Sequence, residues 1–259
     1  MDLGLAGRTA VVTGASKGIG LAITRGLVAE GVHVVAGARK SSADLDALAA
    51  RGAVTPVEVD LATVDGPAQL VAAAGDAVDI LVNNVGLALP RVDGFLAITE
   101  EMWQASLNLN LMSAVRATRS ALPVMLERGA GVIVNVGSVN ARLPDPRVVD
   151  YSAAKAALLN FAKSLSKEFG GQGIRVNTLA PGPVATDLWL GDDGVAARVS
   201  RATGQSAQDV AAGAAAQMVT GRFTRPDEVA DLVVLLASDR TANITGANFA
   251  IDGGLLTTI

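Results

Sequence analysis

Short apolar runs, rich in valine and isoleucine, alternate along the chain with longer stretches in which apolar residues recur at helical spacing. The short runs are apolar at almost every position, which is typical of strands buried on both faces of a parallel sheet. The pattern predicts strands at 9–13, 32–36, 54–59, 80–82, 131–136, 174–179 and 248–251, and helices near 18–30, 42–51, 65–75, 99–127, 150–169 and 226–237.

This regular alternation predicts an α/β fold in which one doubly wound parallel sheet of about seven strands carries helices on both faces. No internal repeat or linker-like composition divides the chain, so residues 1–259 are expected to form a single domain. Residues 187–224 depart from the alternation by separating a strand from the next helix. Such an insertion often forms a lid over an active site, and the alternative interpretation is a pair of surface helices.

Composition excludes several classes of protein. The net charge of −4 and the pI near 5.0 argue against a nucleic-acid-binding protein, which would need a basic surface. No apolar run approaches the length of a membrane helix, and the N-terminus lacks the layout of a signal peptide. We therefore expect a cytoplasmic protein without a membrane partner.

The chemistry available to an active site is limited. The chain has no cysteine, which excludes thiolate nucleophiles, disulfides and Cys-ligated metals. Its one histidine, His33, lies inside an apolar run and is expected on a strand face rather than in a catalytic triad or a zinc site. No metal site is predicted. Acid–base chemistry must come from aspartate, glutamate, lysine or the single tyrosine, Tyr151.

A glycine-rich segment, TGASKGIG at 13–20, follows the first predicted strand and opens the first predicted helix. Glycines at such a junction make a tight turn and let the backbone approach a pyrophosphate, which the amides at the helix N-terminus bind. The segment is therefore predicted to bind a dinucleotide. The residues involved would be Gly14, Ser16, Lys17, Gly18, Ile19 and Gly20.

The end of the second predicted strand indicates which dinucleotide is bound. A site for NAD usually carries an acidic residue here, which accepts a hydrogen bond from the ribose 2′-hydroxyl. This chain has Ala38 followed by Arg39, and Lys17 lies in the glycine-rich segment. Two cations suit the 2′-phosphate of NADP(H). NAD(H) is the less favoured alternative, which would hold if both cations were merely solvated.

Tyr151 and Lys155 are four residues apart in a predicted helix and therefore share a face. A free tyrosine, with a pKa of ~10, is a poor base near neutral pH, and a neighbouring ammonium is expected to lower that pKa. Ser138 follows the strand at 131–136, at the carboxyl end where ligands bind in an open α/β sheet. Its hydroxyl can donate to a carbonyl oxygen on which charge develops.

Three motifs together resemble the short-chain dehydrogenase/reductase family. They are the Gly-x3-Gly-x-Gly spacing in 13–20, Asn-Asn-Val-Gly at 83–86, and Ser138-x12-Tyr151-x3-Lys155. Val85 departs mildly from the alanine usual in the second motif. The resemblance covers residues 7–254, implies a Rossmann-type fold, and in general layout is strongest to 3-oxoacyl-carrier-protein reductases.

The resemblance also implies roles that the pattern does not assign. It implies that Asn110 kinks its helix and holds a proton-relaying water, which completes a catalytic set of Asn110, Ser138, Tyr151 and Lys155. It also implies cofactor contacts. These are Asp60 and Leu61 at the adenine, Asn84 and Gly86 at its ribose, Tyr151 and Lys155 at the nicotinamide side, and Pro181, Gly182, Val184 and Thr186 at the nicotinamide itself.

The resulting hypothesis is an enzyme that transfers hydride between NADP(H) and a ketone or secondary alcohol. Apolar residues expected around the site indicate a hydrophobic substrate: Leu87, Leu89, Phe95, Leu143, Leu188 and Trp189. One alternative is a carrier-bound 3-oxoacyl reductase, although Gly129 and Gln172 stand where that subgroup carries basic residues. Another is a non-catalytic NADP(H)-binding scaffold or sensor. A sugar-nucleotide epimerase is disfavoured, because its glycine spacing differs and its chain is longer.

Assembly is the last expectation. The predicted helix 150–169 is apolar on more than one side, and the C-terminal residues 246–259 carry no charge after Asp252. In the family these two elements form the two interfaces of a tetramer. We therefore expect a homotetramer, with a dimer through the helix alone as the alternative.

Overall fold

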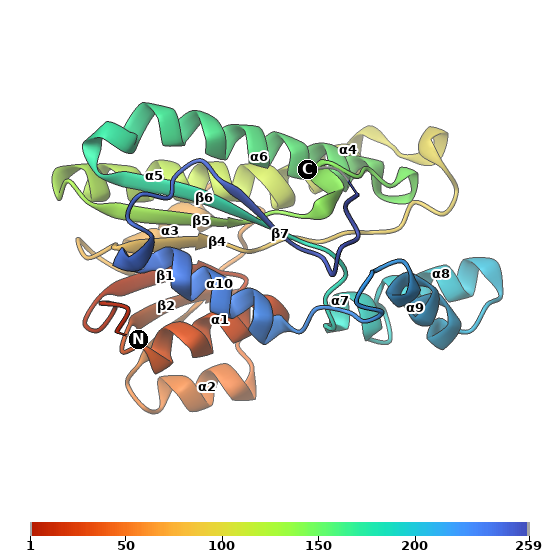
Figure 1. Cartoon of the computed structure of the whole chain (residues 1–259), viewed down its shortest axis with the longest axis horizontal. Helices are drawn as coiled ribbons and strands as arrows, with labels where there is room; N and C mark the ends of the chain where they lie inside the picture. The colour runs from red at the N-terminus through yellow and green to blue at the C-terminus, as the bar shows by residue number, and fades with distance from the viewer. Residues whose placement is uncertain (1, 258–259) are drawn as a thin grey trace.

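The computed structural model describes residues 2–257, which fold around one sheet of seven parallel strands in the order β3-β2-β1-β4-β5-β6-β7 (Figure 1). The predicted fold class is confirmed. Three strands begin and end at the predicted residues, and the others differ by one or two residues. The strands are β1 (Thr9–Thr13), β2 (His33–Ala38), β3 (Val54–Glu58), β4 (Ile80–Asn83), β5 (Gly131–Val136), β6 (Ile174–Pro181) and β7 (Asn248–Ile251).

Helices cover both faces of the sheet (Figure 1). One face carries α1 (Gly18–Ala29), α2 (Ala43–Ala49) and α10 (Pro226–Ala237), and the other carries α3 (Gly66–Ala72), α5 (Ser113–Glu127) and α6 (Val149–Phe169). Short 3-10 helices occupy several connections. They are η1 (Phe95–Ala97), η3 (Val139–Ala141), η4 (Pro146–Val148), η5 (Gly170–Gln172) and η6 (Asp239–Thr241).

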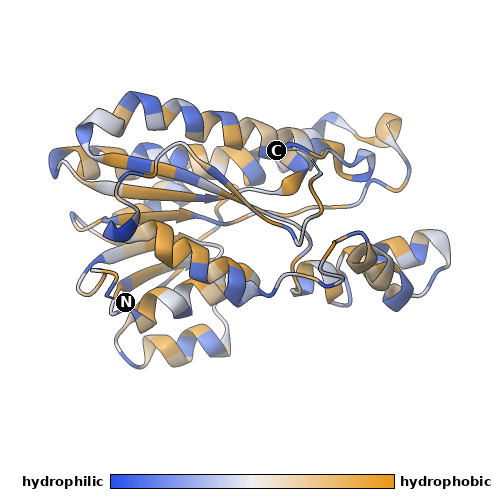
Figure 2. Cartoon of the chain, viewed as in Figure 1, coloured by the Kyte–Doolittle hydropathy of each residue, from blue (hydrophilic) through white to orange (hydrophobic). Residues whose placement is uncertain are grey.

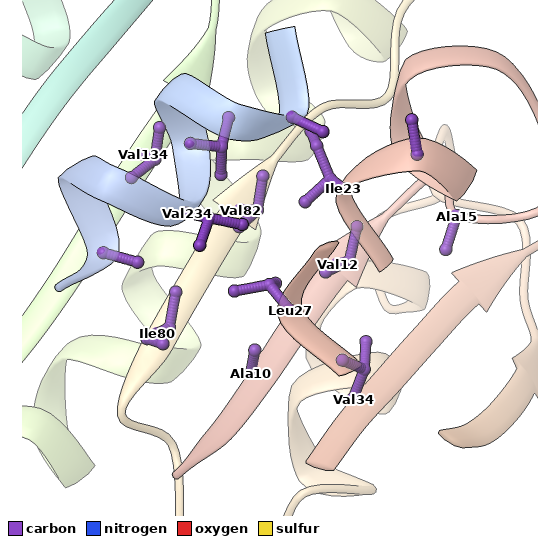
Figure 3. Packing of buried hydrophobic residues seen from close by; sticks show 14 of the residues in the cluster. Ala10, Val12, Ala15, Ile23, Leu27, Val34, Ile80, Val82, Val134 and Val234 are labelled. Atoms are coloured by element: carbon purple, nitrogen blue, oxygen red, sulfur yellow. The ribbon is translucent and has the colours of Figure 1, made fainter. Parts of the chain in front are cut away.

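The hydrophobic effect fixes this layering, because most strand positions are apolar and the inner strands need cover on both faces. Figure 2 shows the strands mainly in the hydrophobic colour, whereas the helices carry both colours. On the α1 side, Ile23 and Leu27 of α1 and Val234 of α10 pack against Val12 and Val82 of the sheet (Figure 3). His33 lies at the start of β2, where its Nε2 is 2.9 Å from Thr55 Oγ1, so the prediction of a strand-face histidine is confirmed.

The opposite face contains two aligned rows of residues across the strands. Val11, Leu81, Ile133 and Val176 are register partners and form an apolar row under α5 and α6. Two residues further along the strands, on the same face, Asn83, Asn135, Thr178 and Asn248 form a polar row across β4, β5, β6 and β7. The polar row thus lies between the apolar core and the carboxyl ends of the strands.

The predicted helix at 99–127 is interrupted. It begins as α4 (Glu100–Leu107), passes through one π-helical turn, η2 (Asn108–Met112), and continues as α5. A π-helical turn widens the helix locally and is frequent at functional sites. Asn110, around which the resemblance implies a kink, lies in this turn.

Residues 187–224 contain three short helices, α7 (Asp187–Leu190), α8 (Val195–Thr203) and α9 (Ala207–Ala216). Figure 1 shows them gathered beyond the carboxyl ends of the strands. A bridge between Val184 and Thr224 closes the base of the insertion, and Trp189 packs edge-on against Phe223 with ring centres 5.3 Å apart. No helix in the described part of the chain combines the length and hydrophobicity needed to cross a membrane.

Candidate active site

The strand order reverses between β1 and β4, and ligands of open α/β sheets bind in the crevice at such a point. Asn84, just after β4, fastens the glycine-rich turn here. Its side-chain amide donates to the carbonyl oxygens of Thr13 at 2.8 Å and Gly14 at 3.2 Å. The Thr13 hydroxyl in turn accepts from the backbone N–H groups of Asn84 at 2.8 Å and Val85 at 3.0 Å. The turn is therefore held rigidly at the switch point.

The glycines of this turn are required by its geometry. Gly14 and Gly18 have φ of +68° and +56°, values that favour glycine. A Cβ on Gly20 would lie 2.1 Å from the carbonyl oxygen of Gly14, so only glycine lets α1 start this close to the turn. Lys17 is the N-cap of α1 and its side chain makes no cap hydrogen bond, which leaves amides at the helix start available to an anion.

Two serines and three charged residues flank the turn. The carbonyl oxygen of Ser16 accepts from the Ser42 hydroxyl at 2.7 Å, and Ile19 is half-buried behind the turn. Lys17 and Arg39 are both exposed, at the start of α1 and just after β2. Glu58 is the register partner of Ala38, and its carboxylate accepts from the backbone N–H of Ser41 at 3.5 Å.

The loop after β6 closes the site from the other side. Pro181 ends β6 and is buried, Gly182 follows it, and Val184 is buried at the base of the insertion. The backbone N–H of Thr186 donates to Val184 O at 2.8 Å. A Cβ on Gly18 would lie 3.3 Å from Thr186 Cγ2, which places this loop against the start of α1. The predicted nicotinamide loop and the predicted phosphate turn are thus neighbours.

Asp60 and Leu61 lie in the turn after β3, which ends at Glu58 rather than at the predicted residue 59. Leu61 is buried in the core. The carboxylate of Asp60 is exposed and accepts from the backbone N–H of Ala62 at 3.0 Å, which fixes its direction.

Ser138, Tyr151 and Lys155 come together beyond the carboxyl end of β5. Ser138 is the first residue before η3, and its hydroxyl donates to Asn140 Oδ1 at 3.0 Å while accepting from the Asn140 backbone at 3.2 Å. Tyr151 and Lys155 project from the first turns of α6. Lys155 is 3% exposed, and its ammonium donates to the carbonyl oxygen of Val136 at 2.9 Å.

The pKa of Tyr151 differs from expectation. Burial raises the pKa of the phenol above 10.0, and its hydrogen bond with Ser138 lowers it in part. The expected lowering by Lys155 is wrong for this structure, because that ammonium is bound to Val136 O and lies over the ring face, 5.6 Å from the ring centre. Burial also lowers the pKa of Lys155 to about 8. Both shifts have the same cause, since burial disfavours whichever form is charged.

Asn110 is buried in the π-helical turn and faces the loop after β4. Its Oδ1 accepts from the backbone N–H of Leu87 at 2.8 Å, and its Nδ2 donates to Leu87 O at 3.0 Å. A Cβ on Gly86 would lie 2.9 Å from Asn110 Oδ1 and 3.3 Å from Lys155 Nζ, so glycine permits this approach. Asn108, two residues earlier, instead accepts from Arg116 at 3.1 Å.

Three polar residues near the site were not predicted. Asn140 orients Ser138 through two hydrogen bonds. A serine hydroxyl often bonds to the residue two positions later, so this contact is indicated by the sequence. Asp150 precedes Tyr151 and is paired with Arg91 of the loop after β4. No spacing in the sequence indicates that pair, because its partners are 59 residues apart.

The fold and this site together define a dinucleotide-dependent oxidoreductase of the Rossmann type. A family model described as short chain dehydrogenase matches residues 8–192. D-threitol dehydrogenase of Mycolicibacterium smegmatis is 38% identical over 98% of this chain and 94% of its own. The 3-oxoacyl-[acyl-carrier-protein] reductase of Escherichia coli is 35% identical over 96% of this chain and 97% of its own.

Solved structures agree with these matches. L-sorbose reductase from Gluconobacter frateurii, complexed with NADPH and L-sorbose, superposes with a TM-score of 0.90 at 35% identity, covering 100% of both chains. The chain belongs to the short-chain dehydrogenase family, as its motifs indicated. It is therefore an oxidoreductase that acts on CH–OH or C=O groups.

Proposed function

We propose that this protein reduces a ketone, or oxidises the corresponding secondary alcohol, with NADP(H) at the Ser138–Tyr151–Lys155 cluster. The observation that carries the proposal is the position of this cluster beyond β5, where Ser138 and Lys155 are buried and Tyr151 is half-buried, with Lys155 close to Gly86 just after β4. The predicted cofactor, NADP(H), is confirmed by a relative of the same architecture, L-sorbose reductase, which was solved with NADPH.

The residues of the chain fit this cofactor. Its phosphates would lie at the uncapped start of α1 and the turn 14–20, where the glycines leave no side chain in the way. Its 2′-phosphate would pair with Lys17 and Arg39, which are both exposed. The loop at Pro181, Gly182, Val184 and Thr186 would hold the nicotinamide, and Asp60, Leu61, Asn84 and Gly86 the adenosine. When bound, NADPH supplies the hydride.

The proton chemistry belongs to the protein. In reduction, the Ser138 hydroxyl would donate a hydrogen bond to the substrate oxygen, where negative charge develops. Tyr151 would give that oxygen its phenolic proton, which the group carries near neutral pH. Lys155, held at Val136 O, would bind the ribose and stabilise the phenolate left behind. Asn110 would hold the water that returns the proton.

The substrate is expected to be a ketone with apolar substituents. Leu87 and Leu143 border this end of the sheet with exposed side chains, and Trp189 lies in the insertion. A second candidate is a small ketose or polyol, because two relatives are named for D-threitol and L-sorbose. A carrier-bound 3-oxoacyl substrate is the third, favoured by the match to the E. coli reductase.

One experiment tests the proposal. The purified protein is given NADPH and a panel of apolar ketones, ketoses and 3-oxoacyl thioesters, and NADPH oxidation is followed. At least one class should be turned over, and Tyr151→Phe should reduce that turnover by at least ~10²-fold while NADPH affinity stays nearly intact. A protein that binds NADPH but reduces nothing in the panel would instead be a scaffold or sensor, and full activity of Tyr151→Phe would contradict the mechanism.

We further propose that residues 1–259 act as one domain whose insertion at 187–224 is the substrate lid, and that the protein is a cytoplasmic homotetramer. An apolar groove of about 260 Å³ between α5 and α6, lined by Leu122, Phe161, Leu165 and their neighbours, supports a helix-pair interface. The second proposed interface includes the C-terminal segment, of which Thr258 and Ile259 lie outside the described residues. Light scattering should give four times 26.1 kDa, and a stable monomer would contradict the assembly.

A further inference from the structure

A buried ion pair connects the loop after β4 to the residue that precedes Tyr151. The guanidinium of Arg91 contacts Asp150 Oδ2 through both Nε, at 3.2 Å, and Nη2. The side chains of Arg91 and Asp150 are 12% and 2% exposed. Each of the other ion pairs in the described residues has at least one partner that is more than a third exposed. This pair is therefore the least screened by solvent.

Besides the bonds of Asn84 and Val85 to the glycine-rich turn, the pair is one of three attachments of the same loop. The backbone N–H of Arg91 donates to the carbonyl oxygen of Arg147 at 2.6 Å, in the turn that leads into α6. Four residues earlier, the backbone N–H of Leu87 donates to Asn110 Oδ1, and the carbonyl oxygen of Leu87 accepts from Asn110 Nδ2. Loop 84–94 is thus bound at one point to the π-helical turn of Asn110 and at two points to the start of the Tyr151 helix.

Asp150 lies where a shift of the attached segment would also displace Tyr151. Asp150 lies in the first turn of α6, where the helix dipole favours a carboxylate, and Tyr151 is the next residue. A shift of this turn would move the phenol oxygen. The loop it holds carries Leu87, whose exposed side chain borders the same end of the sheet. One interaction therefore fixes two sides of the space that the substrate would enter.

We propose that Arg91 and Asp150 are a positioning pair that holds loop 84–94 against the start of α6 and thereby sets the affinity for the carbonyl substrate. The inference rests on the proposed function. The two side chains are paired with each other, and neither residue forms a hydrogen bond or ion pair with the glycine-rich turn or Arg39. Loss of the pair should consequently leave NADPH binding intact while weakening substrate binding.

The first test is a comparison of steady-state constants for the wild type, Arg91→Met and Arg91→Lys. In Arg91→Met the KM for the ketone should rise at least ~5-fold with kcat kept within ~2-fold, and the Kd for NADPH should stay within ~2-fold. Arg91→Lys keeps the charge and should lie between the two. If Arg91 only stabilised the fold, its loss would lower the fraction of active enzyme, which reduces kcat and leaves KM unchanged. That result, or an unchanged KM, would overturn the proposal.

Arg128→Met is the matched control. It breaks an Arg–Asp pair in which Arg128 Nη2 lies 2.6 Å from Asp79 Oδ1. That pair lies just before β4 and β5, at the ends of these strands away from the site. The Arg128→Met variant should leave the KM for the ketone unaltered.

A second readout is independent of activity. Backbone amide exchange in 84–94 and 147–151 should accelerate in Arg91→Met, while exchange in β4 and β5 stays as in the wild type. Unchanged exchange in both segments would overturn the positioning role. A wild type that reduces no substrate would overturn the proposed function only, and this measurement would still decide whether the pair holds the loop.

Discussion

The ammonium nitrogen of Lys155 lies 5.6 Å from the centre of the Tyr151 ring, over its face, and donates its hydrogen bond to Val136 O. The two side chains share a face of α6, as their spacing requires, yet the cation is not at the phenol oxygen. Burial consequently dominates both groups: it raises the pKa of Tyr151 and lowers that of Lys155 to about 8. In the protein without cofactor, Tyr151 is therefore a protonated phenol near neutral pH.

A first prediction concerns the stability cost of burying Lys155. Its pKa falls from 10.5 to about 8, so between these pH values the unfolded chain holds a proton that the folded chain has lost, and stability rises with pH. Below pH 8 the folded state bears the full cost, on the order of 3 kcal/mol at about 1.4 kcal/mol per pKa unit. Lys155→Met should therefore be more stable than the wild type at pH 7.

Urea unfolding without cofactor measures this difference, which should shrink as the pH is raised toward 10.5. Lys163→Met is the control, because Lys163 lies further along α6 and its ammonium donates to Gly246 O in an exposed position. A Lys155→Met variant that is less stable than the wild type at pH 7 would show that the bond to Val136 O outweighs the cost of desolvation.

The second prediction concerns cofactor choice. Arg39→Asp should shift preference from NADP(H) toward NAD(H), because a cation that pairs with the 2′-phosphate is replaced by a carboxylate that repels it. The ratio of kcat/KM for the two cofactors should change by ~10²-fold or more. Lys40→Asp, on the adjacent exposed residue, is the control for the change in net charge. A wild type that already prefers NAD(H) would refute the role given to Lys17 and Arg39.

The third prediction compares two glycines. Gly20→Ala places a Cβ 2.1 Å from Gly14 O, so the glycine-rich turn must move, and NADPH affinity should fall by more than ~10-fold. Gly213 lies inside α9 with open space around its Cβ position. Gly213→Ala should instead stabilise that helix by roughly 0.5–1 kcal/mol and leave NADPH affinity unchanged. Isothermal titration with NADPH measures the affinity of both variants. Equal NADPH affinities of Gly20→Ala and Gly213→Ala would contradict the assignment of 14–20 as the phosphate-binding turn.

The fourth prediction uses the polar row on the α5–α6 face. Thr178 Oγ1 is buried and has no hydrogen-bond partner within the described protein, whereas Thr118 Oγ1 accepts from Asn83 Nδ2 at 3.1 Å. Thr178→Val should be neutral or stabilising by about 1 kcal/mol, and Thr118→Val should destabilise by about 1 kcal/mol. Denaturant midpoints test both variants. Destabilisation by Thr178→Val would indicate that a bound water satisfies this hydroxyl.

The layout of the protein follows from the pattern of its amino-acid sequence. Continuous apolar runs such as 131–136 predict buried parallel strands because both faces of such strands need apolar cover. The glycine spacing at 13–20 and the four-residue interval from Tyr151 to Lys155 are local features, and local geometry follows from the chain alone. The pattern of the chain therefore predicts about seven strands in one doubly wound sheet, together with the main site residues.

Features that join distant parts of the chain depend instead on how the helices and strands pack together. The pairing of Arg91 with Asp150 joins residues 59 positions apart, and the polar row joins four strands through their register. The predicted direction of the pKa shift at Tyr151 is wrong for the same reason, because that shift also depends on residues far away in the sequence. Helical spacing places Lys155 on the right face, but the amount of burial and the capture of its ammonium by Val136 O are set by packing of α6 on the sheet. Desolvation depends on every neighbouring atom, and those neighbours come from the whole fold.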